Sequence, residues 1–256
     1  MFLTNEIERP ADGIKAMGRG VIAARKVEGG FEIVAEWSTG GDGPHDLMRN
    51  AGILADAKAE PLVVANGGIE PNTDEARDAE ATGSSISLID PQGGGLMGEG
   101  RLSADLSSLS LRHLARDGRG QIVVAAQELL KDGVARPLLF AIGKDGALKP
   151  FDAPEMEWRA LRGYVGSVSY DRSGAYVACA TPRGGRVAVW RADGKYLGAV
   201  PLVDGCGLAA GPEAGQFVAT SGYGEVILLA VSEHEVGVIA RRTGGPRFDN
   251  HMVTVG

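Results

Sequence analysis

The sequence predicts an all-β fold: a β-propeller built from four-stranded antiparallel blades. Short runs rich in Val, Ile, Leu and Ala recur at strand length, and turn clusters that combine Gly with Asp or Ser separate them. The order of strands and turns also repeats, with a period of about 40 residues, which is the size of one propeller blade. Glycine supplies 39 of the 256 residues, as suits a chain with many tight turns.

The predicted strands follow one another with few helical windows between them. Their ranges are 2–7, 20–27, 31–38, 61–66, 85–90, 109–117, 121–127, 137–143, 165–171, 175–181, 186–192, 196–202, 206–211, 216–222, 225–231 and 235–241. Two windows compete as helices. The window Pro44–Ala57 is a weak one because Gly52 interrupts it, whereas 154–162 has apolar residues at helical spacing and predicts one or two turns.

The blade repeat is clearest at 165–202, where four strands alternate with the turn DRSG, the loop PRGG and the turn ADGK. The same order recurs at 206–241, at 109–151 and at 45–102. The last of these has an insertion at 67–84, between its second and third strands. The segment 1–39 offers three strands, the first of which aligns with the second strand of the other blades. A lone closing strand is predicted near 250–255.

These repeats predict one propeller domain over 1–256 with about five blades. The chain opens inside a blade and closes on a lone strand, so we expect about five blades of a seven-bladed ring whose amino-terminal blades are missing. The competing arrangement is a five-bladed propeller in which the last strand completes the first blade.

Composition excludes several classes of function. The net charge of −7 and the lack of a basic stripe argue against nucleic-acid binding. No apolar run approaches the roughly 18 residues of a membrane span, and the first residues of the sequence show no charged segment followed by an apolar one. No GxSxG, HExxH or Walker loop occurs, and the glycine-rich clusters QGGGLMGEG and GGDG are interpreted as turns. Cys179 and Cys206 are interpreted as small buried residues.

Candidate binding residues follow from the way a propeller places its loops. Loops between blades and loops joining second to third strands emerge on one face, where ligands usually bind. The candidate ligand-binding residues on these loops are His45, Asp46, Asn66, Arg112, His113, Arg183, Arg186, Asn250 and His251. The same loops bring Gln127, Glu128, Arg162 and Tyr164 to that face.

Histidines suggest a metal site on this face. His45, His113 and His251 fall at equivalent positions, at the entrance to innermost strands around the central channel. Imidazole suits a transition metal such as iron or copper, and Asp46 and Asp249 could complete or orient the site. The alternative is that each histidine hydrogen-bonds the backbone of the neighbouring blade.

Arginines suggest an anion site. Arg183 and Arg186, in the loop PRGGR, could clamp an anion, with Arg112 on the same face. The alternative is that they are solvated loop arginines. Trp158, in the short helical window, either caps the channel or packs into the core.

Six ordered motifs resemble a known family. They are GPHDL at 43–47, LVVANGGIEPNTD at 62–74, SLRHLARD at 110–117, RGYVGSVSYDRSG at 162–174, PRGGRVAVW at 182–190 and DNHMVTV at 249–255. Together they resemble, over the whole chain, the bacterial propeller proteins of domain-of-unknown-function family 1513. The resemblance implies a longer, seven-bladed protein with a twin-arginine export signal and a periplasmic location. One departure is Asp46, where the family tends towards Glu.

The resemblance also implies a link to iron acquisition, with an imelysin-type iron-uptake lipoprotein or a dihaem peroxidase-like protein as partner. It supplies no catalytic residues. We therefore carry two hypotheses: a non-enzymatic periplasmic binding protein accessory to iron uptake, which acts through the channel-mouth face, and an enzyme of the lactonase or metal-dependent oxidoreductase type. The first is favoured because the sequence offers neither a nucleophile with its base nor a complete metal-ligand signature.

Overall fold

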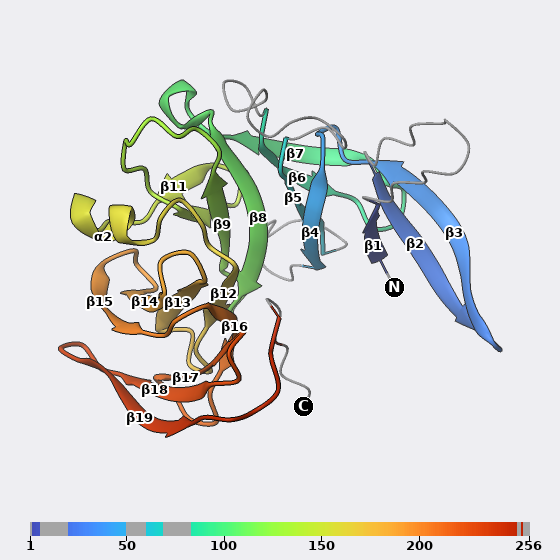
Figure 1. The fold of residues 1–256 in the computed structure, drawn as a ribbon. Coiled ribbons are helices and arrows are strands. Elements are labelled where there is room, and N and C mark those ends of the chain that lie inside the picture. Colours follow the sequence, from blue (N-terminus) through green and yellow to red (C-terminus); the bar gives the residue numbers. More distant parts are fainter. Residues whose placement is uncertain (1, 6–19, 50–59, 69–82, 250–251, 253–256) are drawn as a thin grey trace. The chain divides into compact units, whose positions relative to one another are not determined.

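The computed structural model describes residues 2–5, 20–49, 60–68, 83–249 and 252, and within them the fold is all-β (Figure 1). Five antiparallel sheets follow one another along the chain, one with three strands and four with four. In every sheet, strands that are consecutive in sequence are hydrogen-bonded neighbours. This meander is the arrangement of propeller blades, and it confirms the predicted all-β class.

The strands are grouped here by sheet. The first sheet holds β1 (Phe2–Asn5), β2 (Gly20–Val27) and β3 (Gly30–Ser38), and the second holds β4 (Pro44–Arg49), β5 (Leu62–Asn66), β6 (Ser85–Ile89) and β7 (Leu96–Arg101). The third holds β8 (Leu109–Arg116), β9 (Ile122–Glu128), β10 (Leu139–Ile142) and β11 (Leu148–Pro150). The fourth holds β12 (Ser167–Tyr170), β13 (Tyr176–Thr181), β14 (Arg186–Arg191) and β15 (Tyr196–Pro201). The fifth holds β16 (Gly205–Ala210), β17 (Gln216–Ser221), β18 (Val226–Val231) and β19 (Val236–Arg242).

Two short helices complete the described elements: the 3₁₀ helix η1 (Ala104–Leu106) and the α-helix α2 (Glu155–Ala160). The chain divides into two compact units, residues 1–112 with 142–148, called unit 1, and residues 113–141 with 149–256, called unit 2. Among the described residues, no helix has the length and apolarity needed to cross a bilayer.

In the second sheet the two middle strands are the most buried. Every residue of β5 and β6 is buried, whereas β4 and β7 each have one buried residue. In unit 2, the apolar residues of β13, β14, β17 and β18 form one buried cluster around Phe217 and Ile227. On each of these strands alternate residues, each an Ala, Val, Phe, Ile or Leu, belong to the cluster. This alternation is the pattern that predicts a β-strand with one buried face.

Turn chemistry follows the sequence closely. Gly146, Gly174 and Gly194, in the turns GKDGA, DRSG and RADGK, adopt positive φ angles of 86°, 70° and 97°. In RDGRG the residue with positive φ is Gly120 rather than the glycine that follows Asp117. Glycine reaches this region without the steric cost that a side chain adds, so these turns can be tight.

Carboxylates at two of these turns tie successive sheets of unit 2 together. Asp171 accepts hydrogen bonds from the backbone N–H of Gly215, at 2.8 Å, and from the Ser173 hydroxyl, at 2.6 Å. Arg119 pairs with Asp117 at 2.8 Å and donates to the Gly174 carbonyl at 2.7 Å. Burial opposes ionisation of Asp171, yet the hydrogen bonds from Ser173, Gly215 and Tyr176 lower its pKa below the usual range.

The structure corrects two expectations. Residues 44–49 of the weak helical window form strand β4, and 50–57 lie outside the described residues. The cluster QGGGLMGEG is not all turn, because Leu96–Arg101 is strand β7; Gly98 and Gly100 occur where the sheet edge packs closely, and a Cβ at Gly100 would lie 1.8 Å from the Gly146 carbonyl oxygen. The helix at 154–162 and the insertion between Asn66 and Ser85 are confirmed.

Candidate functional site

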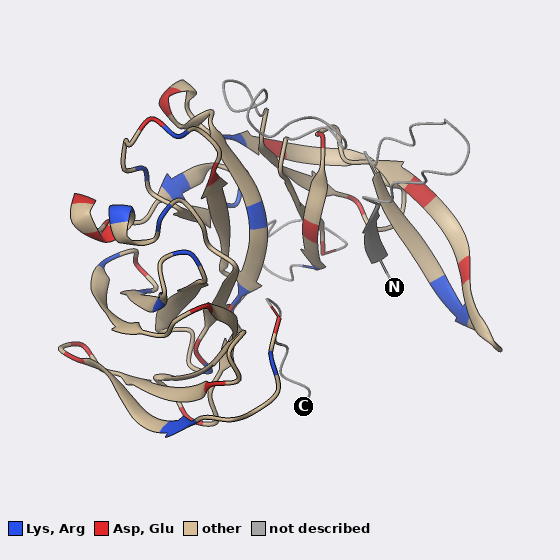
Figure 2. Ribbon diagram, viewed as in Figure 1, with Lys and Arg blue, Asp and Glu red and all other residues tan. Residues whose placement is uncertain are grey.

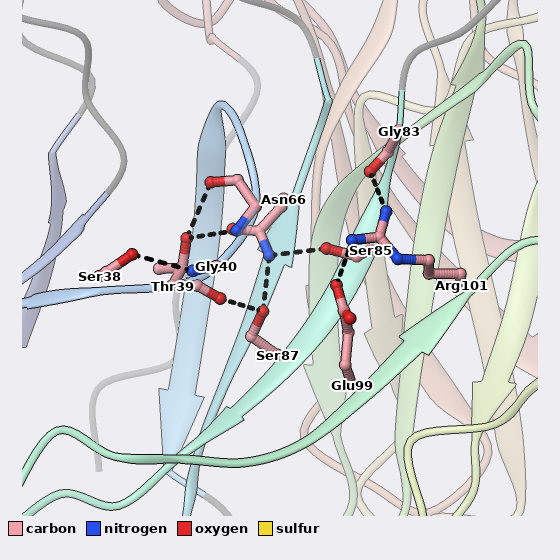
Figure 3. A network of polar contacts seen from close by, with 10 residues as sticks. Ser38, Thr39, Gly40, Asn66, Gly83, Ser85, Ser87, Glu99 and Arg101 are labelled. Carbon is pink, nitrogen blue, oxygen red and sulfur yellow. Dashed lines mark hydrogen bonds and ion pairs between the residues drawn. The ribbon is translucent and has the colours of Figure 1, made fainter.

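Asn66 is the centre of a buried polar network in unit 1 (Figure 3). It is the last residue of β5 and is fully buried, and its Nδ2 donates to the hydroxyls of Ser85, at 3.0 Å, and Ser87, at 2.8 Å, both on β6. Ser87 in turn donates to the Thr39 carbonyl at 2.6 Å. The Asn66 Oδ1 is buried and has no hydrogen-bond partner among the described residues. The amide thus joins three chain segments, which is a structural role.

A second polar chain in unit 1 contains two of the predicted binding residues. The Arg112 Nε donates to the Ser110 hydroxyl at 2.8 Å, and Ser110 donates to the Gly67 carbonyl at 2.9 Å. A guanidinium nitrogen of Arg112 lies 3.2 Å from the His45 Nδ1. Because a guanidinium only donates, His45 must accept through an unprotonated Nδ1 in this contact. His45 and Arg112 are therefore brought together, and Asp46 accepts from the backbone N–H of Leu47 at 2.8 Å.

The predicted equivalence of the histidines does not extend to His113. His45 is four residues before the end of β4, whereas the residue four before the end of β8 is Arg112. His113 is buried in the middle of β8 and does not lie at the entrance to the strand. His251 and Asn250 lie outside the described residues. No three His, Cys, Asp or Glu side chains form a cluster suited to a metal in the described part of the chain, so the histidine metal site stays a prediction.

Unit 2 contains a cavity of about 330 Å³ with a strongly cationic lining. The β9–β10 loop, the α2 segment and the β13–β14 loop form its walls. The described lining residues with charged side chains are Glu128, Lys131, Arg136, Arg159, Arg162 and Arg183. The helix α2 has one basic residue, Arg159, after the acidic residues of its first turn, and Figure 2 shows further basic residues on the loops beside it. We call this cavity the arginine pocket.

Two of its cations are neutralised and brace the β9–β10 loop. Arg136, with 12% of its side chain exposed, pairs with Glu128 at 3.0 Å and with Asp132 at 2.7 Å. The hydrogen bond from Arg136, followed by that from the Val134 N–H, lowers the pKa of Asp132 to about 2. Arg159 pairs with Glu155 at 2.6 Å and donates to the Gly133 carbonyl at 2.5 Å. These bonds hold the loop against α2.

Aromatic packing fixes α2 itself. Trp158 is buried and stacks on Trp190 of β14, with ring centroids 5.4 Å apart. The Trp190 Nε1 donates to the Asp152 carbonyl at 3.0 Å. Core packing, the second of the two predicted roles, therefore accounts for Trp158, which also lines the arginine pocket. A helix of six residues gains little stability from its own hydrogen bonds, so this stack is what positions Arg159 and Arg162.

Three cations of the pocket have no acidic partner within the described residues. None of the ion pairs among the described residues involves Lys131, Arg162 or Arg183. The Arg183 guanidinium lies 4.4 Å from the centre of the Tyr164 ring, a cation–π contact, and the Arg162 guanidinium donates to the Arg183 carbonyl at 3.5 Å. Both contacts orient a positive charge without neutralising it.

The backbone that carries Arg162 is strained. Its φ of 55° lies in the left-handed region, which a residue with a side chain seldom adopts. The next residue, Gly163, has a φ of 66°, and its carbonyl accepts from the Glu128 N–H at 2.8 Å. A backbone outlier of this kind costs about 1–3 kcal/mol, and such outliers concentrate at functional sites.

The two arginines of the predicted anion site, Arg183 and Arg186, have different surroundings in the structure. Arg183 lines the pocket, whereas Arg186 pairs with Glu157 at 3.4 Å and is not among the lining residues. Glu157 also accepts from the Tyr196 hydroxyl at 2.8 Å, and burial followed by this hydrogen bond raises the pKa of Tyr196. Lys131 and Arg136 also line the pocket, and neither is among the predicted binding residues. The sequence feature that could have indicated Arg136 is its spacing of four residues from Asp132, in a charged loop between two buried strands.

Comparison with known proteins gives the family but no activity. A family model described as "Protein of unknown function (DUF1513)" matches residues 1–255. The chain belongs to this family. No curated protein matches the chain. A solved structure of a functionally unknown protein from Desulfotomaculum acetoxidans has the same fold, with a TM-score of 0.59 at 11% sequence identity. The match covers 90% of this chain and 65% of that chain, so the present chain spans less than two thirds of the protein that it resembles.

Proposed function

We propose that this DUF1513 protein is a binding protein that takes up an anionic ligand in the arginine pocket and does not transform it. The observation that carries the proposal is the charge of the lining: Lys131, Arg162 and Arg183 line the cavity, and none of them pairs with an acidic side chain in the part of the chain that the structure describes. Guanidinium groups match the geometry of carboxylates and phosphates. The volume of about 330 Å³ lies at the lower end of the range for small-molecule sites.

Binding is favoured over catalysis by the state of the acidic group in the lining. Among the described lining residues the one carboxylate is Glu128, and it accepts from Arg136 and from the Leu130 N–H. Because both contacts direct the Glu128 carboxylate at the protein rather than at a ligand, this carboxylate is poorly placed to act as a general base. No observation favours the alternative of a lactonase or a metal-dependent oxidoreductase.

The full architecture, the cellular location and the partners in this proposal come from the family resemblance. The five sheets are blades of a seven-bladed propeller, and the protein works in the periplasm as an accessory to iron uptake, next to an imelysin-type lipoprotein or a dihaem peroxidase-like protein. The order of strands in the sheets supports the propeller. Sequence motifs support the setting, which would be tested by co-purification of the protein from the periplasm of its native host.

Isothermal titration calorimetry with succinate tests the anion site. We expect succinate to bind the unmodified protein at low ionic strength, and salt to weaken it. The double variant R162Q/R183Q should bind at least about tenfold more weakly, because a hydrogen bond to a charged group contributes about 1.5–3 kcal/mol. The matched control R172Q removes an exposed arginine in the turn between β12 and β13, away from the lining, and should bind normally. An unchanged affinity of R162Q/R183Q, or an equal loss of affinity in R172Q, would refute the proposal.

A further inference from the structure

The lining of the arginine pocket has an apolar side as well as a cationic one. Leu130, Val134 and Leu138, all on the β9–β10 loop, line the cavity together with the ring of Trp158. Leu138 and Trp158 are buried, whereas Val134 is exposed to solvent, with a relative exposure of 55%. A site for a small hydrophilic anion such as phosphate is formed by charged side chains and backbone N–H groups, and it does not require an apolar wall.

The exposed valine is held in place by its neighbours. The Val134 N–H donates to Asp132 at 2.9 Å. Arg136, two residues after Val134, forms an ion pair with the same Asp132. The adjacent Gly133 carbonyl is bound by Arg159 of α2. The two bonds to the backbone fix the peptide group that precedes Val134, and the pairs of Arg136 with Asp132 and Glu128 hold the loop on its other side, so the exposed position of the Val134 side chain is set by its neighbours. An apolar side chain fixed at the rim of a charged cavity is preorganised for an apolar part of a ligand.

We propose that the arginine pocket selects an amphipathic carboxylate, a compound with one acidic group and a compact apolar body. The carboxylate is bound by Arg162 and Arg183, and the apolar body lies against Leu130, Val134, Leu138 and Trp158. At about 30 Å³ for each water-sized group, the cavity holds a ligand on the order of ten non-hydrogen atoms. An aryl-substituted short-chain acid has this size. The inference rests on the proposed function and narrows it to one class of ligand.

Three matched probes separate this inference from the proposed function. They are 3-phenylpropionate, which has both parts, succinate, a dicarboxylate without an apolar body, and 3-phenylpropanamide, which has the ring without the charge. We expect 3-phenylpropionate to bind at least about tenfold more tightly than succinate, because the ring is removed from water, and the amide to give no measurable binding. Quenching of tryptophan fluorescence, to which Trp158 contributes, reports occupancy alongside calorimetry.

Each outcome has a distinct meaning. If succinate binds as tightly as 3-phenylpropionate, the amphipathic class is wrong and the anion site survives. If neither acid binds, the anion site itself is wrong. If the amide binds as tightly as the acid, the arginines do not recognise the ligand, and both proposals fail.

A pair of valine variants then locates the apolar body. V134S should weaken 3-phenylpropionate about threefold or more and leave succinate unchanged, because the loop bonds do not involve the valine side chain. The control V203S alters a valine that is 66% exposed between β15 and β16, outside the lining, and should change neither affinity. Since both valines are exposed, both variants are expected to fold. An unchanged affinity of V134S for 3-phenylpropionate would overturn the placement of the apolar body.

Discussion

The Asn66 network of unit 1 and the arginine pocket of unit 2 use polar side chains in opposite ways. In unit 1, Asn66, Ser85 and Ser87 are fully buried, and their donors are directed at one another and at the backbone. In unit 2, Arg162 and Arg183 are exposed at the rim of a cavity and have no acidic partner among the described residues. A polar group that stabilises the fold has its hydrogen-bond or ionic partners within the protein, whereas a group without such partners is available to a ligand. The contrast shows that these partners matter more than the residue type.

The largest expected effect is on the unit 1 network. Asn66→Leu removes two buried hydrogen bonds and leaves the hydroxyls of Ser85 and Ser87 short of a partner, so we expect a loss of about 2–4 kcal/mol in the free energy of unfolding. Urea denaturation measures it. Gln92→Ala, at an exposed turn position, is the control and should cost less than about 0.5 kcal/mol. Equal midpoints for the two variants would show that the network does not hold the fold.

A smaller effect is expected from the buried ion pair of the arginine pocket. Arg136→Met leaves Glu128, with 9% of its side chain exposed, without its cation, and we expect a loss of about 2–3 kcal/mol. The comparison is Arg241→Met, which breaks the more exposed pair of Arg241 with Glu225 and should cost at most about 1 kcal/mol. Chemical denaturation of both variants decides the matter. A costlier Arg241→Met would contradict the bracing role of Arg136.

A third prediction concerns the wall between α2 and the β13–β14 loop. A Cβ at Gly184 would lie 2.5 Å from the Ala160 carbonyl oxygen, so Gly184→Ala should push the loop that carries Arg183 away from α2. We expect succinate affinity to fall several-fold, by about 1 kcal/mol, while the protein stays folded. Gly237→Ala, where the nearest atom is 3.9 Å away, is the control. Unchanged affinity in Gly184→Ala would mean that Arg183 is not positioned by this contact.

The smallest effect is on pH dependence. The folded-state pKa of Asp132 is about 2, below the usual value near 3.9, so its pairing with Arg136 stabilises the protein fully above about pH 4. This contribution is lost as the pH falls through 2. Thermal melts should therefore place D132N slightly below the unmodified protein at pH 7, with the gap closing between pH 4 and pH 2. A gap that widened on acidification would show the opposite sign of coupling.

How far the sequence predicted the molecule depended on the range of the interactions. Strands and turns were predictable because Val and Ile runs and turns such as DRSG act locally, within a few residues. The strand Leu96–Arg101 was missed because its glycines respond to a neighbouring turn, which is distant in sequence. For the site, Arg183 was identified but Lys131 and Arg136 were not. Whether an arginine is neutralised, as Arg186 is by Glu157, depends on tertiary contacts that no spacing in the sequence records.

The most direct test of the central claim is to locate a bound ligand. Crystals of the protein soaked with 3-(4-bromophenyl)propionate would be measured at the bromine absorption edge, where anomalous scattering marks the aryl end of the ligand. The account predicts a bromine peak on the apolar side of the arginine pocket, near Leu138 and Trp158, with the carboxylate at Arg162 and Arg183. A peak confined to another part of the molecule, with the pocket free of ligand density, would contradict it.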